Sequence, residues 1–231
     1  MIRLRRWRPT RTGLLFARLT AVAGMLATLG VGAVVAENRQ SASAAALDRR
    51  VSEMTRAITA ETGRYVDAIT TVTAAAGAVP QLTATAFSQI TAPIAGMRLA
   101  GATSLSYLVP ATDSTVADVQ RRWRARGATD LVLQPEAGKP EHIFSIFNTA
   151  LDGAPRTPGT DVTASPVPTA ALQLARSTAQ VAISDPFLLA RDRDLAPGRR
   201  QQSFILASPV FGPLDAAGNR PFRGWITMGL R

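Results

Sequence analysis

The chain of 231 residues contains a single histidine, His142, and no cysteine. The lack of cysteine excludes disulfides, thiolate metal sites and cysteine nucleophiles, and one histidine excludes a metal site built from several. His142 directly precedes the apolar run Ile143–Phe147, a position typical of a structural strand residue rather than of a general base. No G-x-S-x-G nucleophile elbow and no phosphate-binding Gly/Lys loop occurs. The sequence therefore predicts a chain that is not an enzyme and that holds no metal and no cofactor.

The carboxylates are scattered along the chain. Glu136 and Glu141 flank a Gly-Lys-Pro turn, and Asp185 precedes a proline, so these acids read as loop charges. A glycosidase-type hydrolase would need two opposed carboxylates in one cleft. The alternative to a non-enzymatic chain is thus a membrane-anchored extracytoplasmic hydrolase that uses acids brought together by folding: Glu141, Asp152, Asp161, Asp185 and Asp192.

The densest basic run is Arg-Arg-Trp-Arg-Ala-Arg, residues 121–126. Helical spacing places Trp123 on one face with Val116 and Val119, which predicts a core-facing tryptophan and arginines along the solvent side. The net charge of +10 does not favour a nucleic-acid partner either, because residues 1–18 hold six arginines and no acid. We expect no nucleic-acid binding.

Residues 19–36 carry no charge and follow this arginine cluster. Eighteen helical residues span about 27 Å, close to the hydrocarbon thickness of a thin bilayer. The positive-inside rule then predicts a cytoplasmic segment 1–18, a transmembrane helix 19–36 and an extracytoplasmic region 37–231 at the cell membrane. A cleaved signal peptide, with small residues at Ala33–Ala36, and a buried soluble helix are the alternatives.

Residues 37–79 contain no proline and show apolar side chains at heptad-like spacing, with charges on the other face. This pattern predicts one long stalk helix that packs on its own domain, on a twin helix in a homodimer, or on both. The residues of the stripe are Leu47, Val51, Met54, Ile58, Tyr65 and Val72.

From residue 80 the pattern changes to short helices mixed with strands. A strand at Thr103–Val109 is expected to stop at Pro110, and further strands are expected at Leu131–Leu133 and His142–Phe147. A helix follows at Thr169–Thr178, and the last strands are expected at 181–183, 203–211 and 224–230. This order predicts an α+β fold with an antiparallel sheet over residues 80–231.

Several segments, in order, resemble the CHASE domain, an extracytoplasmic sensory module found before histidine kinases and nucleotide cyclases, including plant cytokinin receptors. The resemblance covers residues 98–211, and the most specific stretch is ALQLARSTAQVAISDPFLL at 171–189. The other matching segments are residues 101–105, 120–127, 141–146, 159–161 and 209–211.

The resemblance implies a PAS-like sensor domain on a long helix, with a small-molecule ligand between the sheet and the surrounding helices. The segment aligned with the carboxylate that holds a purine in plant receptors has no acid here, which implies a different ligand. The resemblance also implies that the sensor region continues beyond residue 231, toward a kinase or cyclase output domain. The pocket positions that it implies are Phe147, Asn148, Thr149, Leu172, Leu174, Ser184 and Phe204.

Three functions remain open from the sequence. The first is the sensory region of a membrane receptor, which relays ligand binding through the stalk helix to an output domain. The second is the anchored hydrolase. The third is an assembly module without a ligand, whose stalk pairs with a partner.

Overall fold

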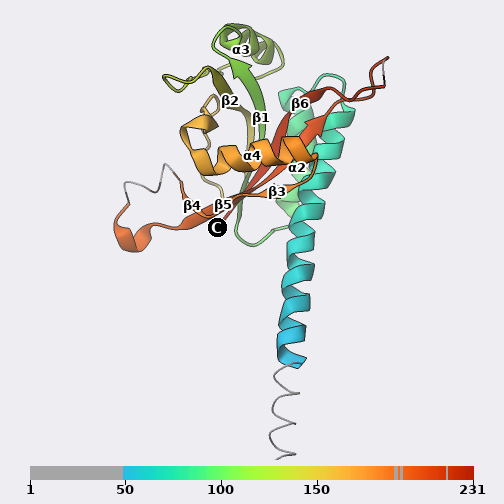
Figure 1. Cartoon of the computed structure of the whole chain (residues 1–231), viewed down its shortest axis with the longest axis vertical. Helices are drawn as coiled ribbons and strands as arrows, with labels where there is room; N and C mark the ends of the chain where they lie inside the picture. The colour runs from blue at the N-terminus through green and yellow to red at the C-terminus, as the bar shows by residue number, and fades with distance from the viewer. Residues whose placement is uncertain (1–48, 190–191, 193–194, 217) are drawn as a thin grey trace, which may run out of the picture. The chain divides into compact units, whose positions relative to one another are not determined.

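The computed structural model describes residues 49–231 except 190–191, 193–194 and 217 (Figure 1). The chain divides into two units, residues 1–60 and 61–231. The predicted transmembrane segment 19–36 and the first part of the predicted stalk, 37–48, lie outside the described residues. Within the part of the chain that the structure describes, no helix has the length and apolar character needed to cross a bilayer.

Residues 49–78 are helical and form what we call the long helix. In the first unit its apolar side chains are exposed: Val51 is 54%, Met54 65% and Ile58 64% accessible. In the second unit its apolar side chains are buried, because Ile69 and Val72 belong to the core of the domain. The predicted apolar stripe thus has two environments, one exposed and one packed on the chain's own domain.

The second unit is built on one antiparallel sheet with strand order β2-β1-β6-β5-β3, and β4 pairs with β5 beside this path. This arrangement confirms the α+β class with an antiparallel sheet. The strands are β1 (Ala102–Thr112), β2 (Glu141–Ala150), β3 (Ala182–Ile183), β4 (Phe187–Leu188), β5 (Gln202–Phe211) and β6 (Phe222–Leu230). The helices after the long helix are α2 (Ala84–Gly96), α3 (Val116–Ala125), η1 (Val162–Ala164), α4 (Pro166–Thr178) and η3 (Pro197–Arg199).

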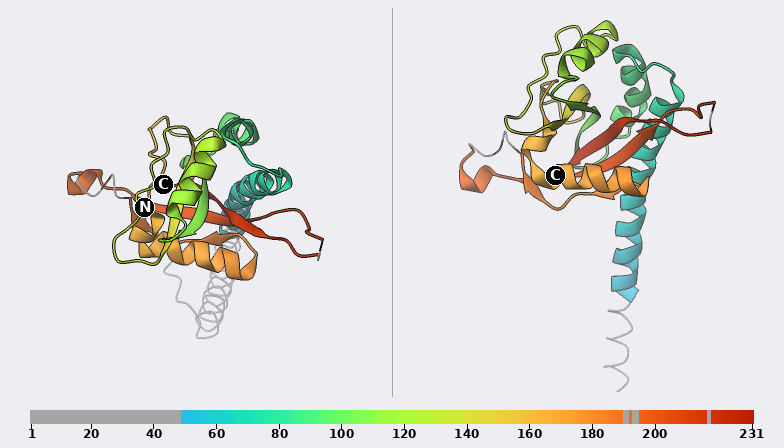
Figure 2. Two further views of the ribbon diagram at one scale, coloured as in Figure 1. Left: turned by 90° about the horizontal axis from the view of Figure 1, so that it is seen from above. Right: turned by 45° about the horizontal axis from the view of Figure 1, so that its top comes forward.

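Helices cover both faces of the sheet. Residues 61–78, α2 and α3 enclose the larger core, in which Trp123 is buried beside Tyr107 and Phe147. On the opposite face α4 packs over a smaller cluster that includes Leu172 and Trp225. Figure 2 shows α4 and the helix of residues 61–78 on opposite sides of β5 and β6. We call the side that α4 covers the α4 face and the other side the helical face.

Two details of the strands differ from the sequence-based expectation. β1 does not stop at Pro110 but continues to Thr112. The pairing of β1 with β6 ends at Leu108, so β1 pairs only with β2 at Pro110. The N–H group that Pro110 lacks therefore costs no hydrogen bond to β6. The predicted strand at Leu131–Leu133 is wrong, because this segment lies outside the strands and only Gln134 forms an isolated bridge.

Candidate functional site

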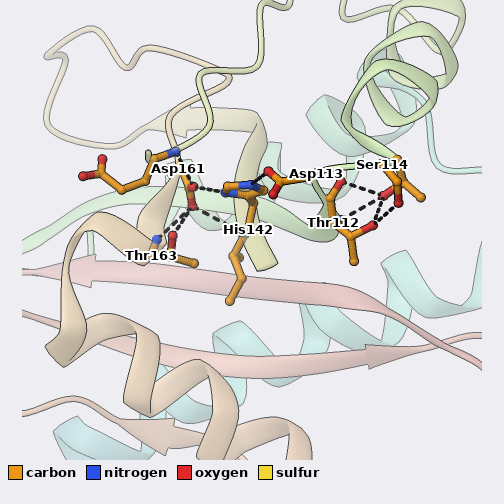
Figure 3. Close-up of polar contacts among 9 residues, drawn as sticks. Thr112, Asp113, Ser114, His142, Asp161 and Thr163 are labelled. Carbon is orange, nitrogen blue, oxygen red and sulfur yellow. Dashed lines mark hydrogen bonds and ion pairs between the residues drawn. The ribbon is translucent and has the colours of Figure 1, made fainter. Parts of the chain in front are cut away.

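His142 lies between two aspartates that come from different parts of the chain (Figure 3). Its side chain is fully buried, and its Nδ1 lies 2.6 Å from Oδ2 of Asp161. Its Nε2 lies 2.8 Å from Oδ1 of Asp113. β2 supplies the histidine, the turn after β1 supplies Asp113, and the residue that caps η1 supplies Asp161. We call these three residues the histidine clamp.

Asp161 is the better bound of the two acids. Its Oδ1 accepts hydrogen bonds from the backbone N–H groups of Ile143 and Thr163, at 3.2 and 3.0 Å, and from the hydroxyl of Thr163 at 2.8 Å. Its Oδ2 also accepts from the backbone N–H of Glu136 at 3.0 Å. Burial alone would raise the pKa of Asp161, but these hydrogen bonds and the one to His142 outweigh burial and lower it.

The same contacts decide the charge of His142. Burial acts to lower its pKa, while the hydrogen bonds to Asp113 and Asp161 and the charges of these acids raise it, with a net upward shift. A carboxylate can only accept, so a histidine that faces a carboxylate at each ring nitrogen donates from both in its charged form. Because both nitrogens are occupied, neither is free to act as a general base or a metal ligand. The clamp is therefore a structural tie between three segments, as the position of His142 in the sequence predicted.

A cavity of about 650 Å³ lies beside the clamp on the α4 face. The indole of Trp225 lines it, and the Trp225 Nε1–H donates to the backbone oxygen of Leu172 at 2.7 Å, which ties α4 to the sheet. The lining combines this apolar wall with hydroxyl, amide and charged groups, as small-molecule sites do. The polar and charged residues of the lining are Thr112, Thr115, Lys139, Glu141, His142, Thr163, Thr169, Gln173 and Arg176.

A second polar feature on β1 and β2 surrounds Asn148. Oδ1 of Asn148 accepts hydrogen bonds from the hydroxyls of Ser106 and Ser145, at 2.7 and 2.9 Å. Its Nδ2 is buried and has no hydrogen-bond partner within the described structure. A buried amide with free donors is uncommon in folded proteins and marks a position where a ligand acceptor would be favourable.

The other residues that the sequence predicted for the pocket do not converge on one place. Phe147 is part of the larger core, where its ring lies 5.6 Å from that of Phe87, and Phe204 packs against the same core. The Thr149 hydroxyl lies 2.8 Å from that of Thr91. Leu172 is fully buried on the inner face of α4, while Leu174 and Ser184 both line a separate cavity of about 440 Å³. Their role in ligand binding stays a prediction.

Three of the five acids considered for a hydrolase are held by different partners. Asp152 pairs with Arg156 at 2.9 Å, Asp192 with Arg231 at 2.6 Å, and Asp161 belongs to the histidine clamp. Among the described residues, no group of three or more His, Cys, Asp or Glu side chains is placed to hold a metal ion. This arrangement does not support the hypothesis of a hydrolase.

Sequence reasoning missed Asp113 and the pairing of Asp161 with His142. The signal for Asp161 was local: Asp-Val-Thr at residues 161–163 is the pattern of an aspartate that caps its own turn, and the side chain does accept from the N–H of Thr163. Asp113 gave no such signal, because an aspartate after a strand is ordinary turn chemistry.

Comparison with known proteins agrees with this fold. A family model described as CHASE domain matches residues 80–231, which is more than half of the chain. A search of curated proteins finds no match. CHASE domains are sensory rather than catalytic modules, they bind small molecules in receptors, and they are typically extracellular. The chain therefore belongs to the CHASE-domain family of sensory modules.

Proposed function

We propose that the chain is the extracytoplasmic sensory region of a membrane receptor, which binds a small molecule and relays binding through the long helix to a kinase or cyclase domain. The observation that carries this proposal is the family match over residues 80–231. The uncharged segment 19–36 after an arginine cluster supports the membrane anchor, and the α+β domain at the end of a long helix supports the relay.

We propose that the ligand binds on the α4 face. The cavity beside the histidine clamp has the volume of a small-molecule site and an aromatic wall with polar groups around it. The free amide donors of Asn148, which was among the predicted pocket residues, support a polar contact on strands β1 and β2. Among the described residues that line the cavity, the one acid is Glu141, which is exposed, so the expected ligand differs from one held by a buried carboxylate.

The relay would use the sheet as a rigid body between the ligand and the long helix. The last turn of this helix approaches β5 without an intervening side chain, because a Cβ added to Gly77 would lie 2.5 Å from the backbone oxygen of Phe211. β5 also faces α4 on its other side, through Ala207. A ligand that prefers one position of α4 would therefore shift the equilibrium between positions of the helix.

The test is a thermal-shift screen of small metabolites on the intact chain. A true ligand is expected to raise the midpoint of unfolding in a concentration-dependent way, because it binds the folded state. The rise should be lost in Gln173→Ala and Asn148→Ala, and kept in Ser177→Ala, an exposed position on α4 outside the cavity lining. Absence of any stabilising compound, or stabilisation that survives both Gln173→Ala and Asn148→Ala, would contradict the proposal.

A further inference from the structure

A separate cavity of about 340 Å³ lies on the helical face, between the end of the long helix, α3 and β6. Tyr107, Trp123 and Phe222 give it an aromatic wall. Three arginines also line it: Arg122 of α3, Arg126, which is the C-cap residue of α3, and Arg223 of β6. The helical spacing predicted that the arginines of residues 121–126 lie along the solvent side. In the structure, two of them, Arg122 and Arg126, line this cavity.

The positive charge in this cavity is not neutralised by the protein. Among the described residues that line the cavity, none is acidic. Within the described part of the chain, none of the three guanidinium groups forms an ion pair with a carboxylate. Arg126 lies over the Trp123 ring at 5.0 Å, and Nη1 of Arg223 donates to the backbone oxygen of Val79 at 2.7 Å. These contacts position the cations but leave their charge uncompensated.

The aromatic wall stays neutral. The buried Tyr107 hydroxyl donates to the backbone oxygen of Arg223 at 2.8 Å. Burial raises the pKa of Tyr107 to about 12, although Arg223 and Arg126 act to lower it. Tyr107 is therefore uncharged at neutral pH and supplies no negative charge to the three arginines.

We propose that this cavity is a second ligand site, distinct from the α4 face, for a small organic anion that carries a carboxylate or phosphate group. Guanidinium groups donate pairs of parallel N–H bonds to such oxyanions, and they bind them more strongly than neutral donors do. The volume suits a compound of modest size, and the aromatic wall favours a flat apolar body next to the charged group. The anion would hold α3 and β6 together at the end of the long helix.

The experiment titrates the intact chain with benzoate, with inorganic phosphate and with benzamide, a neutral compound of the same shape as benzoate, using calorimetry. We expect benzoate, phosphate or both to bind at millimolar concentrations or below, and benzamide to bind at least about tenfold more weakly than benzoate. Binding of benzoate alone would identify an aromatic carboxylate, and binding of phosphate alone a phosphorylated ligand; either result supports the site.

Variants locate the binding. Arg122→Gln removes an exposed arginine of the cavity, and Arg122→Gln with Arg126→Gln removes two. We expect at least about a tenfold loss of anion affinity in the double variant. Arg121→Gln is the matched control, because this arginine pairs with Asp118 outside the cavity and its loss should leave affinity unchanged. If the double variant does not fold, the single variant Arg122→Gln still tests whether loss of a cavity arginine weakens anion binding. No binding of either anion, or equal losses in Arg122→Gln and Arg121→Gln, would overturn the proposal.

Discussion

His142 shows how one buried charge can tie together segments that are far apart in the sequence. The histidine comes from β2, and its two acids come from the turn after β1 and from the start of η1. Both bonds need the charged form of the ring. The stability that the clamp contributes must therefore depend on pH.

The pH dependence has a defined sign. The pKa of His142 is raised in the folded state, so its contribution to stability is complete below about 6.5, the usual value for an unfolded chain, and is lost as pH rises through the raised pKa. We expect the free energy of unfolding to fall between neutral and alkaline pH in the wild type. The difference from His142→Gln, measured by chemical denaturation across this range, should shrink as pH rises. A constant difference would show that the ring does not titrate there.

The two acids of the clamp should not be equivalent. The Asp161 side chain is 2% exposed and accepts several hydrogen bonds, whereas that of Asp113 is 72% exposed. Asp161→Asn is expected to cost about 3–5 kcal/mol, the scale of breaking a buried charge pair, and Asp113→Asn at most about 1 kcal/mol. Denaturant unfolding of both variants measures this, and equal costs would contradict the assignment.

The stability that Asp161 contributes also depends on pH, in the acid range. The pKa of Asp161 is lowered in the folded state, so its contribution is present above the usual range for aspartate and is lost as pH falls through the folded value. Asp161→Asn should therefore differ from the wild type most at neutral pH and least in strong acid.

At the scale of elements, the segment that carries Asp161 depends on Gly159. Gly159 has a φ of +87°, and a Cβ there would lie 1.9 Å from the backbone oxygen of Val132. Its N–H donates to the oxygen of Ser145, and its own oxygen accepts from the N–H of Gln134. This glycine lets the loop lie against β2 and places Asp161 beside His142.

We expect Gly159→Ala to lower the free energy of unfolding by about 2 kcal/mol or more, because backbone strain and steric overlap add. Gly153→Ala is the control: Gly153 also has a positive φ of +73°, but no atom lies within 4 Å of its added Cβ. Its cost should be limited to the strain of about 1–2 kcal/mol. Thermal or chemical unfolding of both variants decides the point, and equal costs would argue against the close approach.

The sequence predicted elements better than it predicted contacts. The helical spacing of Val119 and Trp123 identified a buried face of α3, because local periodicity determines it, and the strand expected at 203–211 matches β5. The path of β1 through Pro110 depends on where its neighbour β6 ends, which local sequence does not contain. The local sequence also does not show that His142 contacts Asp113 and Asp161. It does not show either that Arg122, Arg126 and Arg223 line one cavity.

At the scale of the whole molecule, the long helix divides its apolar stripe between two roles. The part in the second unit is buried in the domain, through Ile69 and Val72. The part in the first unit exposes Val51, Met54 and Ile58 at heptad spacing. Exposed apolar side chains in such a register are typical of a helix that pairs with another copy of itself, and the homodimer stays a prediction.

We expect Met54→Glu to weaken self-association of the intact chain at least about tenfold, because it places two like charges in the apolar seam of a paired helix. Ser52→Glu adds the same charge two residues away, outside the stripe, and should leave the dimer intact. Sedimentation velocity over a range of protein concentrations compares the three chains. Either of two results would contradict a dimer built on this stripe: a wild-type chain that stays monomeric throughout, or a Met54→Glu chain that associates as strongly as Ser52→Glu. In the second case the exposed stripe would have a different partner, and the relay along the long helix would not depend on pairing at these positions.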